Sequence, residues 1–274
     1  MPTLTNGSVD IHFEDTGDDG RPVVLIHGWP LSGASWSGLR PALQQAGHRV
    51  VTYDRRGFGE SGKPGPDSAY DYDTLTGDLD ALMTGLELHD ASLVGFSMGG
   101  GEVARFIGRH GQDRVHSVVF AAAIPPCLLK DDEHPDGAVD MDTVATMQQG
   151  LRADREAFLD GFMTNFFSAN GELKVTEHQR QQALSLAAQA ELHAAAECIA
   201  SWVTDFRDDL PKITVPTLVI HGDSDAIVPL EVSGQRTHEM VAGSELVVIT
   251  DGPHGVNVSH PEEFNSVVLD FLAR

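Results

Sequence analysis

The sequence predicts an α/β fold in which a mostly parallel sheet is covered by helices on both faces, with an all-helical segment inserted between two strands. Three observations support this prediction: short apolar runs, amphipathic segments between them, and one long segment without strand patterns. The apolar runs are continuous rather than alternating, which is typical of strands buried on both faces. They comprise residues 9–13, 23–27, 49–54, 91–96, 115–121, 217–221 and 245–250.

Helical patterns alternate with these apolar runs. Residues 75–88 place Leu75, Leu79 and Leu82 on one apolar stripe, and residues 262–272 have the same spacing. Because strands that alternate with helices pair in parallel and are covered on both sides, this order predicts a parallel sheet between two helical layers.

The alternation is interrupted once, over residues 125–210. This segment contains helix-like sequence rich in Ala, Gln and Leu, such as residues 179–200, and prolines bracket it at Pro126 and Pro211. Ordinary crossover helices are the alternative, but the segment is too long for one crossover, so we expect a lid. The predicted division is a core of residues 1–124 and 211–274 and a helical lid, or cap, of residues 125–210.

The composition excludes several classes of partner. The chain carries 41 acidic and 18 basic residues, a net charge of −23, and repulsion opposes binding to nucleic acid or to an anionic membrane. No apolar run approaches the roughly 20 residues of a membrane helix. Residues 1–13 lack the features of a signal peptide, so we expect a cytoplasmic protein. Cys127 and Cys198 are expected to be free thiols.

The strongest motif is Gly95-Phe96-Ser97-Met98-Gly99, which follows an apolar strand and opens a helix. A sharp turn from strand to helix forces the central serine into a strained conformation and lifts its hydroxyl clear of the sheet. Neighbours with a Cβ atom would collide there, which explains the glycines. The sequence therefore predicts Ser97 as a nucleophile.

A serine nucleophile needs a base that is oriented by an acid, and in this architecture the acid and the histidine each follow a later strand. Asp223 and Asp225 both follow the strand at residues 217–221. Asp223 is closest to the strand and is expected to fix the turn through its own backbone. Asp225 lies at the tip of the loop, so we favour it as the acid.

The chain has 13 histidines, and His254 is distinguished by its position. It follows the strand at residues 245–250 and immediately precedes the final helix, which predicts that it is the base. His27 and His221 lie at strand ends and are expected to make structural hydrogen bonds. His238 and His260 fall within or beside helices and are expected at the surface.

Two backbone N–H groups should stabilise the oxyanion of the tetrahedral intermediate. One is that of Met98, which follows the nucleophile, and the other should come from the loop after residues 23–27. That loop contains Trp29-Pro30, and because Pro30 has no N–H, Trp29 must be the donor. Pro30 also restricts the backbone of Trp29 and so fixes the direction of its carbonyl.

No cofactor is predicted. The stretch Gly57-Phe58-Gly59-Glu60-Ser61-Gly62 matches a dinucleotide-binding pattern, but it continues into Lys63-Pro64-Gly65-Pro66, which cannot start the required helix. No spacing of His, Cys and carboxylate residues indicates a metal site.

With these motifs located, the chain resembles the bacterial non-haem haloperoxidase, or perhydrolase and arylesterase, branch of the α/β hydrolases. The resemblance spans nearly the whole chain, and the stretches at residues 95–102 and 221–229 are the most specific. The matching stretches are residues 27–30, 54–61, 95–105, 204–207, 221–225 and 253–255.

The resemblance implies an α/β-hydrolase fold, the triad Ser97, Asp225 and His254, and oxyanion donors at Trp29 and Met98. It implies a carboxylesterase that acts on small esters through an acyl-enzyme, without haem or metal. It also implies that hydrogen peroxide can replace water, which releases a peracid that oxidises halide away from the active site. Pro30 is the residue that this branch associates with perhydrolysis, and homo-oligomers are common in it.

Alternative functions remain open at this stage. Haloalkane dehalogenases and epoxide hydrolases are disfavoured, because they carry Asp where this chain has Ser97. A lactone, lactam or C–C bond hydrolase would use the same triad. A non-catalytic hydrolase-like receptor would also keep the triad, but it would show almost no turnover of an activated ester, which distinguishes it from an enzyme. The candidate residues for an apolar acyl site are Trp29, Pro30, Phe96, Ile124, Phe158, Phe162, Phe166, Ile227 and Val228.

Overall fold

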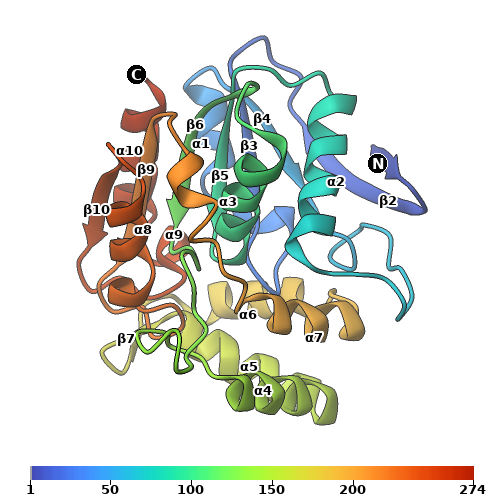
Figure 1. Cartoon of the computed structure of the whole chain (residues 1–274), viewed down its shortest axis with the longest axis vertical. Coiled ribbons are helices and arrows are strands. Elements are labelled where there is room, and N and C mark those ends of the chain that lie inside the picture. Colours follow the sequence, from blue (N-terminus) through green and yellow to red (C-terminus); the bar gives the residue numbers. More distant parts are fainter. Residues whose placement is uncertain (1) are drawn as a thin grey trace.

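The computed structural model describes residues 2–274, so residue 1 of the predicted core lies outside it. Eight strands form one sheet in the order β1-β2-β4-β3-β5-β6-β9-β10 (Figure 1). Neighbouring strands from β4 to β10 are parallel, while β2 pairs antiparallel with β1 and β4. This confirms the predicted mostly parallel sheet. The strands are β1 (Thr3–Asn6), β2 (Val9–Asp15), β3 (Pro22–Ile26), β4 (Arg49–Tyr53), β5 (Ala91–Phe96), β6 (Val115–Ala121), β9 (Thr217–Gly222) and β10 (Glu245–Ile249).

The burial of each strand follows from its place in the sheet. Every residue of β5 and β9, two strands with neighbours on both sides, is buried, which accounts for their continuous apolar sequences. The edge strand β1 was not predicted, because none of its residues is fully buried and its sequence Thr-Leu-Thr-Asn contains a single large apolar side chain.

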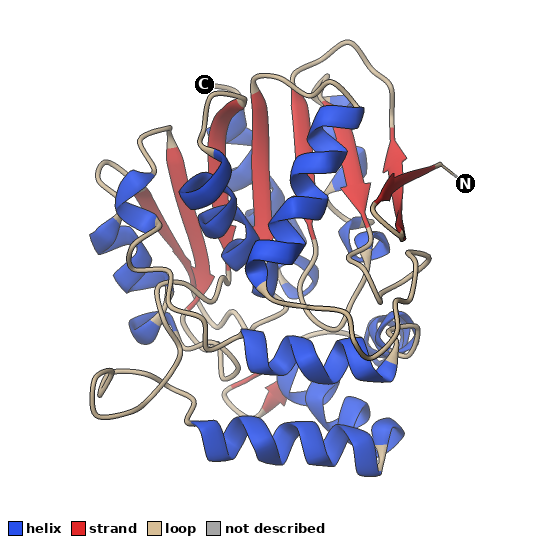
Figure 2. Ribbon diagram, turned by 45° about the vertical axis from the view of Figure 1, so that its right-hand side comes forward, coloured by secondary structure: helices blue, strands red, loops and turns tan. Residues whose placement is uncertain are grey.

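Helices cover both faces of the sheet (Figure 2). The predicted segment at residues 75–88 is α2, which begins earlier because the Asp71 side chain accepts a hydrogen bond from the Thr74 amide and caps the helix. The predicted final helix is α10. The helices outside the insertion are α1 (Arg40–Gln45), α2 (Tyr72–Gly85), α3 (Met98–His110), α8 (Gly234–Met240), α9 (Val256–Ser259) and α10 (Pro261–Leu272).

The chain between β6 and β9 forms a separate helical layer below the sheet in Figure 1. Its helices are α4 (Met141–Ala153), α5 (Arg155–Phe166), α6 (Glu177–Ala187) and α7 (Leu192–Ser201). The helix-like sequence at residues 179–200 is divided between α6 and α7. The break has a tertiary cause, because the Glu191 amide donates to the Gly57 carbonyl (2.7 Å) and the Glu191 side chain caps α7.

The expectation that the insertion contains no strand is wrong in one place. Two-residue strands, β7 (Ser168–Ala169) and β8 (Glu172–Leu173), pair antiparallel around Asn170-Gly171. Both turn residues have positive φ, 52° and 81°. An Asn-Gly pair is the usual sequence of such a turn, so the signal was present in the sequence.

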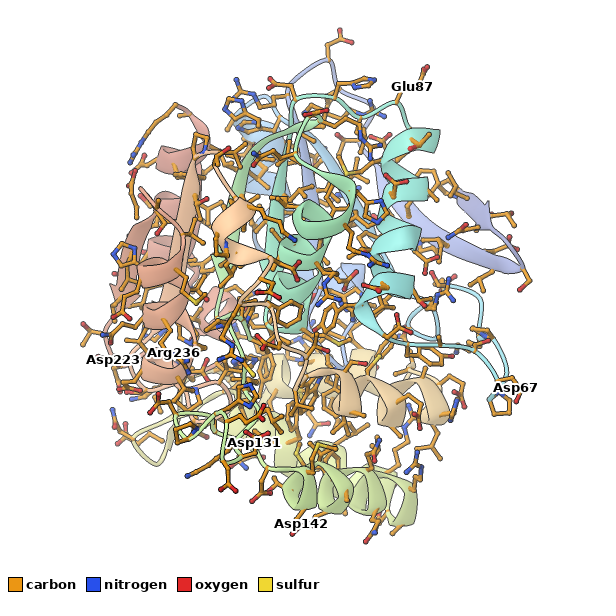
Figure 3. The ribbon with its side chains drawn as sticks, viewed as in Figure 1. Asp67, Glu87, Asp131, Asp142, Asp223 and Arg236 are labelled. Atoms are coloured by element: carbon orange, nitrogen blue, oxygen red, sulfur yellow. The ribbon has the colours of Figure 1, made fainter. Side chains whose placement is uncertain are left out.

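The surface agrees with the composition. Figure 3 shows the labelled Asp67, Glu87, Asp131 and Asp142 projecting from different parts of the molecule, as expected for a solvated acidic surface. Within residues 2–274, each helix is too short or too polar to cross a membrane. Cys127 and Cys198 are both buried and are not joined to each other.

Candidate active site

The predicted serine lies at a sharp turn between β5 and α3. Ser97 has φ 54° and ψ −118°, a conformation that side chains with a Cβ adopt only where the surrounding structure imposes it. The flanking glycines allow this turn. A Cβ atom on Gly95 would lie 2.5 Å from the Gly99 carbonyl oxygen, and one on Gly99 would lie 2.4 Å from the Ile26 carbonyl oxygen. The turn therefore presents the Ser97 hydroxyl at the carboxyl end of the sheet.

The three residues of the predicted triad are brought together from three loops. The His254 Nε2 atom lies 2.9 Å from the Ser97 hydroxyl, and His254 Nδ1 lies 2.7 Å from Asp225 Oδ2. All three side chains are buried, and the rings of Phe96 and Phe166 pack beside the imidazole, with centroids 5.2 and 4.8 Å away. An unbroken chain of hydrogen bonds thus leads from the carboxylate to the hydroxyl.

The Asp225 carboxylate is fully engaged by donors. Its Oδ1 atom accepts from the amides of Ile227 (2.9 Å) and Val228 (2.8 Å), and its Oδ2 atom faces His254 and His221 Nε2 (3.2 Å). Burial alone would raise the pKa of Asp225, but the adjacent His254 and hydrogen bonds from His221 and His254 outweigh it, so the pKa lies below the usual value. The carboxylate therefore remains ionised beside the imidazole.

The competing acid, Asp223, has a different environment. It is exposed, and Figure 3 shows it at the edge of the molecule. Its Oδ1 atom accepts from the Asp251 amide (2.7 Å) and the Ser224 hydroxyl (2.9 Å). Asp223 thus ties the loop after β9 to the loop after β10, rather than bonding to its own backbone as the sequence suggested.

The other histidines make local bonds. His221 Nε2 donates to the Val228 carbonyl (2.8 Å), and His27 lies against the Gly28 carbonyl and the Arg55 amide, which confirms both as structural hydrogen-bonding residues. His238 and His260 are half-buried rather than fully exposed, and each lies 2.8–2.9 Å from a serine hydroxyl.

Two backbone amides next to the serine are free to bind a ligand. Within residues 2–274, the amides of Trp29 and Met98 donate no hydrogen bond to the protein. The loop that carries Trp29 approaches the serine closely, because a Cβ atom on Gly28 would lie 3.1 Å from Ser97 Cβ. The Trp29 indole is anchored by donating to the Ala195 carbonyl (2.9 Å), and Pro30 follows through a cis peptide bond.

An apolar cavity of about 440 Å³ opens beside Ser97. Six of the predicted acyl-site residues line it: Trp29, Ile124, Phe158, Phe162, Ile227 and Val228. Several other residues that line the cavity were not predicted from the sequence, among them Leu128, Val139, Met147, Asn165, Trp202 and Ala226. Most of these lie in the helical insertion and its ends, where no sequence motif indicates which side chains face inward.

Three predicted acyl-site residues, Phe96, Pro30 and Phe166, do not line this cavity. Phe96 is the last residue of β5, and its ring packs on Trp36 (centroids 6.2 Å apart) and beside His254 (5.2 Å) instead of reaching this cavity. With Phe166 it borders a second, smaller cavity of about 80 Å³. Pro30 is buried beside the Trp29 peptide and borders neither cavity.

Comparison with known proteins decides the family. The model of the alpha/beta hydrolase fold family matches residues 21–261. The chain belongs to the α/β hydrolases. This α/β hydrolase is similar to a bromoperoxidase structure from Bacillus anthracis, with 50% identity and a TM-score of 0.95. The match covers 100% of this chain and 99% of the bromoperoxidase chain.

Two curated relatives extend the comparison for this α/β hydrolase. The non-heme chloroperoxidase of Kitasatospora aureofaciens is 40% identical over 99% of both chains. The bifunctional esterase/perhydrolase of Acinetobacter calcoaceticus is 33% identical over 98% of both. These similarities confirm the resemblance to the non-haem haloperoxidase branch.

One other group of side chains in this hydrolase could offer metal-ligating atoms. Ligand atoms of Cys127, His134 and Asp205 lie within 4.8 Å of one another. The Arg207 guanidinium, however, contacts His134 Nε2 (2.7 Å) and Asp205 Oδ2 (2.6 Å). A positively charged group of the chain therefore already lies between the histidine and the carboxylate.

Proposed function

We propose that this α/β hydrolase is a serine esterase that acts on small carboxylic esters. The observation that carries the proposal is the hydrogen-bond chain from Asp225 through His254 to Ser97, which ends at the wall of an apolar cavity. In this proposal Ser97 is the nucleophile, His254 the general base and Asp225 the acid that orients the imidazole. The Trp29 and Met98 amides form the oxyanion hole.

The acylation step follows from this arrangement. His254 accepts the hydroxyl proton as Ser97 Oγ attacks the ester carbonyl, and the two amides stabilise the negative charge on its oxygen. The imidazolium then donates its proton to the leaving alcohol as the ester C–O bond breaks. Asp225 stabilises the imidazolium by remaining ionised. A panel of p-nitrophenyl esters of increasing acyl length tests this reaction, because a non-catalytic receptor would show almost no turnover.

The helical insertion supplies a large part of the acyl site. Phe158 and Phe162 on α5 and Trp202 after α7 contact the Trp29 ring, with edge-to-face centroid distances of 4.9 Å for Phe162 and Trp202. We therefore assign residues 125–210 as a lid that shapes the pocket for apolar acyl groups. The homo-oligomer that the resemblance implies stays a prediction, which sedimentation can test.

Deacylation offers a choice of nucleophile. Water releases a carboxylic acid. Hydrogen peroxide would instead transfer its proton to His254 and attack the acyl carbonyl. The imidazolium would return that proton to Ser97 Oγ as the acyl bond breaks and a peracid leaves. The names of the relatives, chloroperoxidase and esterase/perhydrolase, support this second route. The peracid would then oxidise halide in solution, so this route requires no haem or metal.

Replacement of Pro30 should change the partition between these nucleophiles. Proline fixes its own φ and restricts the preceding residue, so it constrains the Trp29 carbonyl, which could accept a hydrogen bond from peroxide. One such bond is worth about 1 kcal/mol, or several-fold in rate. We expect Pro30→Leu to lower the ratio of peracid to acid at fixed peroxide. An unchanged ratio would refute this role of Pro30 without contradicting the proposed esterase activity.

Ester hydrolysis should slow on acidification because a single group becomes protonated. A protonated His254 cannot accept the serine proton, so kcat/KM should fall as the pH is lowered. Because the pKa of Asp225 lies below the usual value, this carboxylate stays ionised over the same range and contributes no second step. A plot of log kcat/KM against pH should therefore have a limiting slope of one on the acid side. A slope of two would contradict this assignment.

A further inference from the structure

The Gly28–Trp29 peptide carries one of the two proposed oxyanion donors. Because a peptide group is planar, the direction of the Gly28 carbonyl fixes the direction of the Trp29 N–H, which points the opposite way across a trans bond. The Gly28 carbonyl oxygen accepts from the Leu31 amide (3.0 Å) and lies 2.8 Å from His27 Nδ1. These two contacts therefore determine where the Trp29 N–H is aimed.

The tautomer of His27 follows from its other nitrogen. The Arg55 backbone N–H is a donor only, and it lies 3.0 Å from His27 Nε2, so Nε2 must accept. A contact of 2.8 Å between Nδ1 and a carbonyl oxygen requires a proton between them, and that proton is therefore on Nδ1. The Arg55 guanidinium Nη1 is 3.4 Å from Nδ1, too distant to compete for this role.

The surroundings of His27 keep its ring neutral. The side chain is fully buried, and this burial together with the Arg55 charge holds the pKa of His27 well below its ordinary value. Arg55 in turn donates to the His27 carbonyl (2.7 Å) and to Glu102 on α3 (2.8 Å). The oxyanion loop is thus tied through buried hydrogen bonds to the helix that follows Ser97.

We propose that His27 is a positioning residue for the oxyanion hole, in which its Nδ1–H holds the Gly28 carbonyl and so aims the Trp29 amide at the reacting carbonyl. This inference rests on the proposed function. His27 touches no substrate in this account, and it acts through one peptide group. The Leu31 amide shares the same carbonyl, so the loss of His27 should cost less than the loss of an oxyanion donor itself.

The test compares His27→Leu with His27→Asn. Leucine removes the donor, whereas the asparagine amide can donate to the Gly28 carbonyl from nearly the position of Nδ1. We expect His27→Leu to lower kcat about 10- to 100-fold with little change in KM, since removal of a complete oxyanion donor costs about 10²–10³-fold. His27→Asn should recover most of that loss. Affinity for a trifluoromethyl ketone, which forms an oxyanion on Ser97, should fall in parallel with kcat.

A matched control separates positioning from general destabilisation. His12 is also buried, on β2, and its ring makes no hydrogen bond within residues 2–274. Any change in stability caused by His12→Leu should come without the parallel loss of kcat and ketone affinity. If His27→Leu behaves like His12→Leu, with ketone affinity and kcat both unchanged, the inference is overturned.

A measurement on the unmodified protein covers the case in which His27→Leu does not fold. The ¹⁵N chemical shifts of the His27 ring should show a protonated Nδ1 and an unprotonated Nε2 at neutral pH, because Nε2 accepts from the Arg55 amide and the pKa of His27 is held well below its ordinary value. A proton on Nε2 instead would refute the inference. Failure of this inference is distinguishable from failure of the proposed function. Ser97-dependent ester turnover by the unmodified protein tests the proposed function and does not depend on the tautomer of His27.

Discussion

Replacing Ser97 by alanine is expected to reduce ester turnover by about 10³-fold or more, because the hydroxyl that forms the acyl-enzyme is removed while the oxyanion amides remain. Alanine keeps the Cβ atom and the positive φ of the turn, so the protein should fold normally. The measurement is kcat/KM on a p-nitrophenyl ester, together with the free energy of unfolding.

Ser92→Ala provides a matched control for this change. Ser92 is a buried serine near the start of β5, the strand that leads to Ser97, and its hydroxyl lies 2.8 Å from that of Ser117. Its replacement should cost about 1 kcal/mol of stability through a lost hydrogen bond and leave turnover nearly intact. Near-normal activity of Ser97→Ala would show that another group performs the chemistry.

The second large effect is expected for Asp225→Asn, a loss of about 10⁴-fold in kcat. Two backbone amides, those of Ile227 and Val228, donate to Asp225 Oδ1, so the asparagine carbonyl oxygen must occupy that position. Its NH₂ group then faces His254 Nδ1. Because that nitrogen would have to accept, the imidazole proton moves to Nε2, which can no longer accept the proton of Ser97.

The nearby Asp223→Asn is the control for this substitution. Asp223 is exposed and bonds to the Asp251 amide, and an asparagine carbonyl can accept the same bond. We expect turnover to change little and any effect to appear in stability. If Asp223→Asn abolished turnover in a folded protein and Asp225→Asn did not, the two aspartates would exchange roles.

Seven of the eight strands of the sheet and the candidate triad could be predicted from the sequence, because each depends on a local signal. Ser97 lies in a turn whose glycines are required by contacts of 2.4–2.5 Å, and Asp225 and His254 each follow a continuous apolar strand. Alternating strands and helices determine that such loops meet at one edge of the sheet. Local sequence is therefore sufficient to predict the positions of the three candidate catalytic residues.

The cavity wall could not be predicted in the same way. Trp202 and Met147 face the cavity because helices of the insertion pack on Trp29, and this packing leaves no local motif. Phe96 was assigned to the acyl site because it precedes Ser97, but its ring packs on Trp36, and no local pattern indicates this contact. The break before α7 depends on a hydrogen bond from Glu191 to Gly57, two positions far apart in the sequence.

Covalent labelling tests the central claim most directly. A fluorophosphonate reacts with a serine only when a base and an oxyanion hole activate it. We expect one adduct per chain, located on Ser97 by peptide mass spectrometry. Its rate of formation should fall with Asp225→Asn, and it should be absent from Ser97→Ala. An adduct on another residue, or full ester turnover by a protein whose Ser97 remains unlabelled, would contradict the claim.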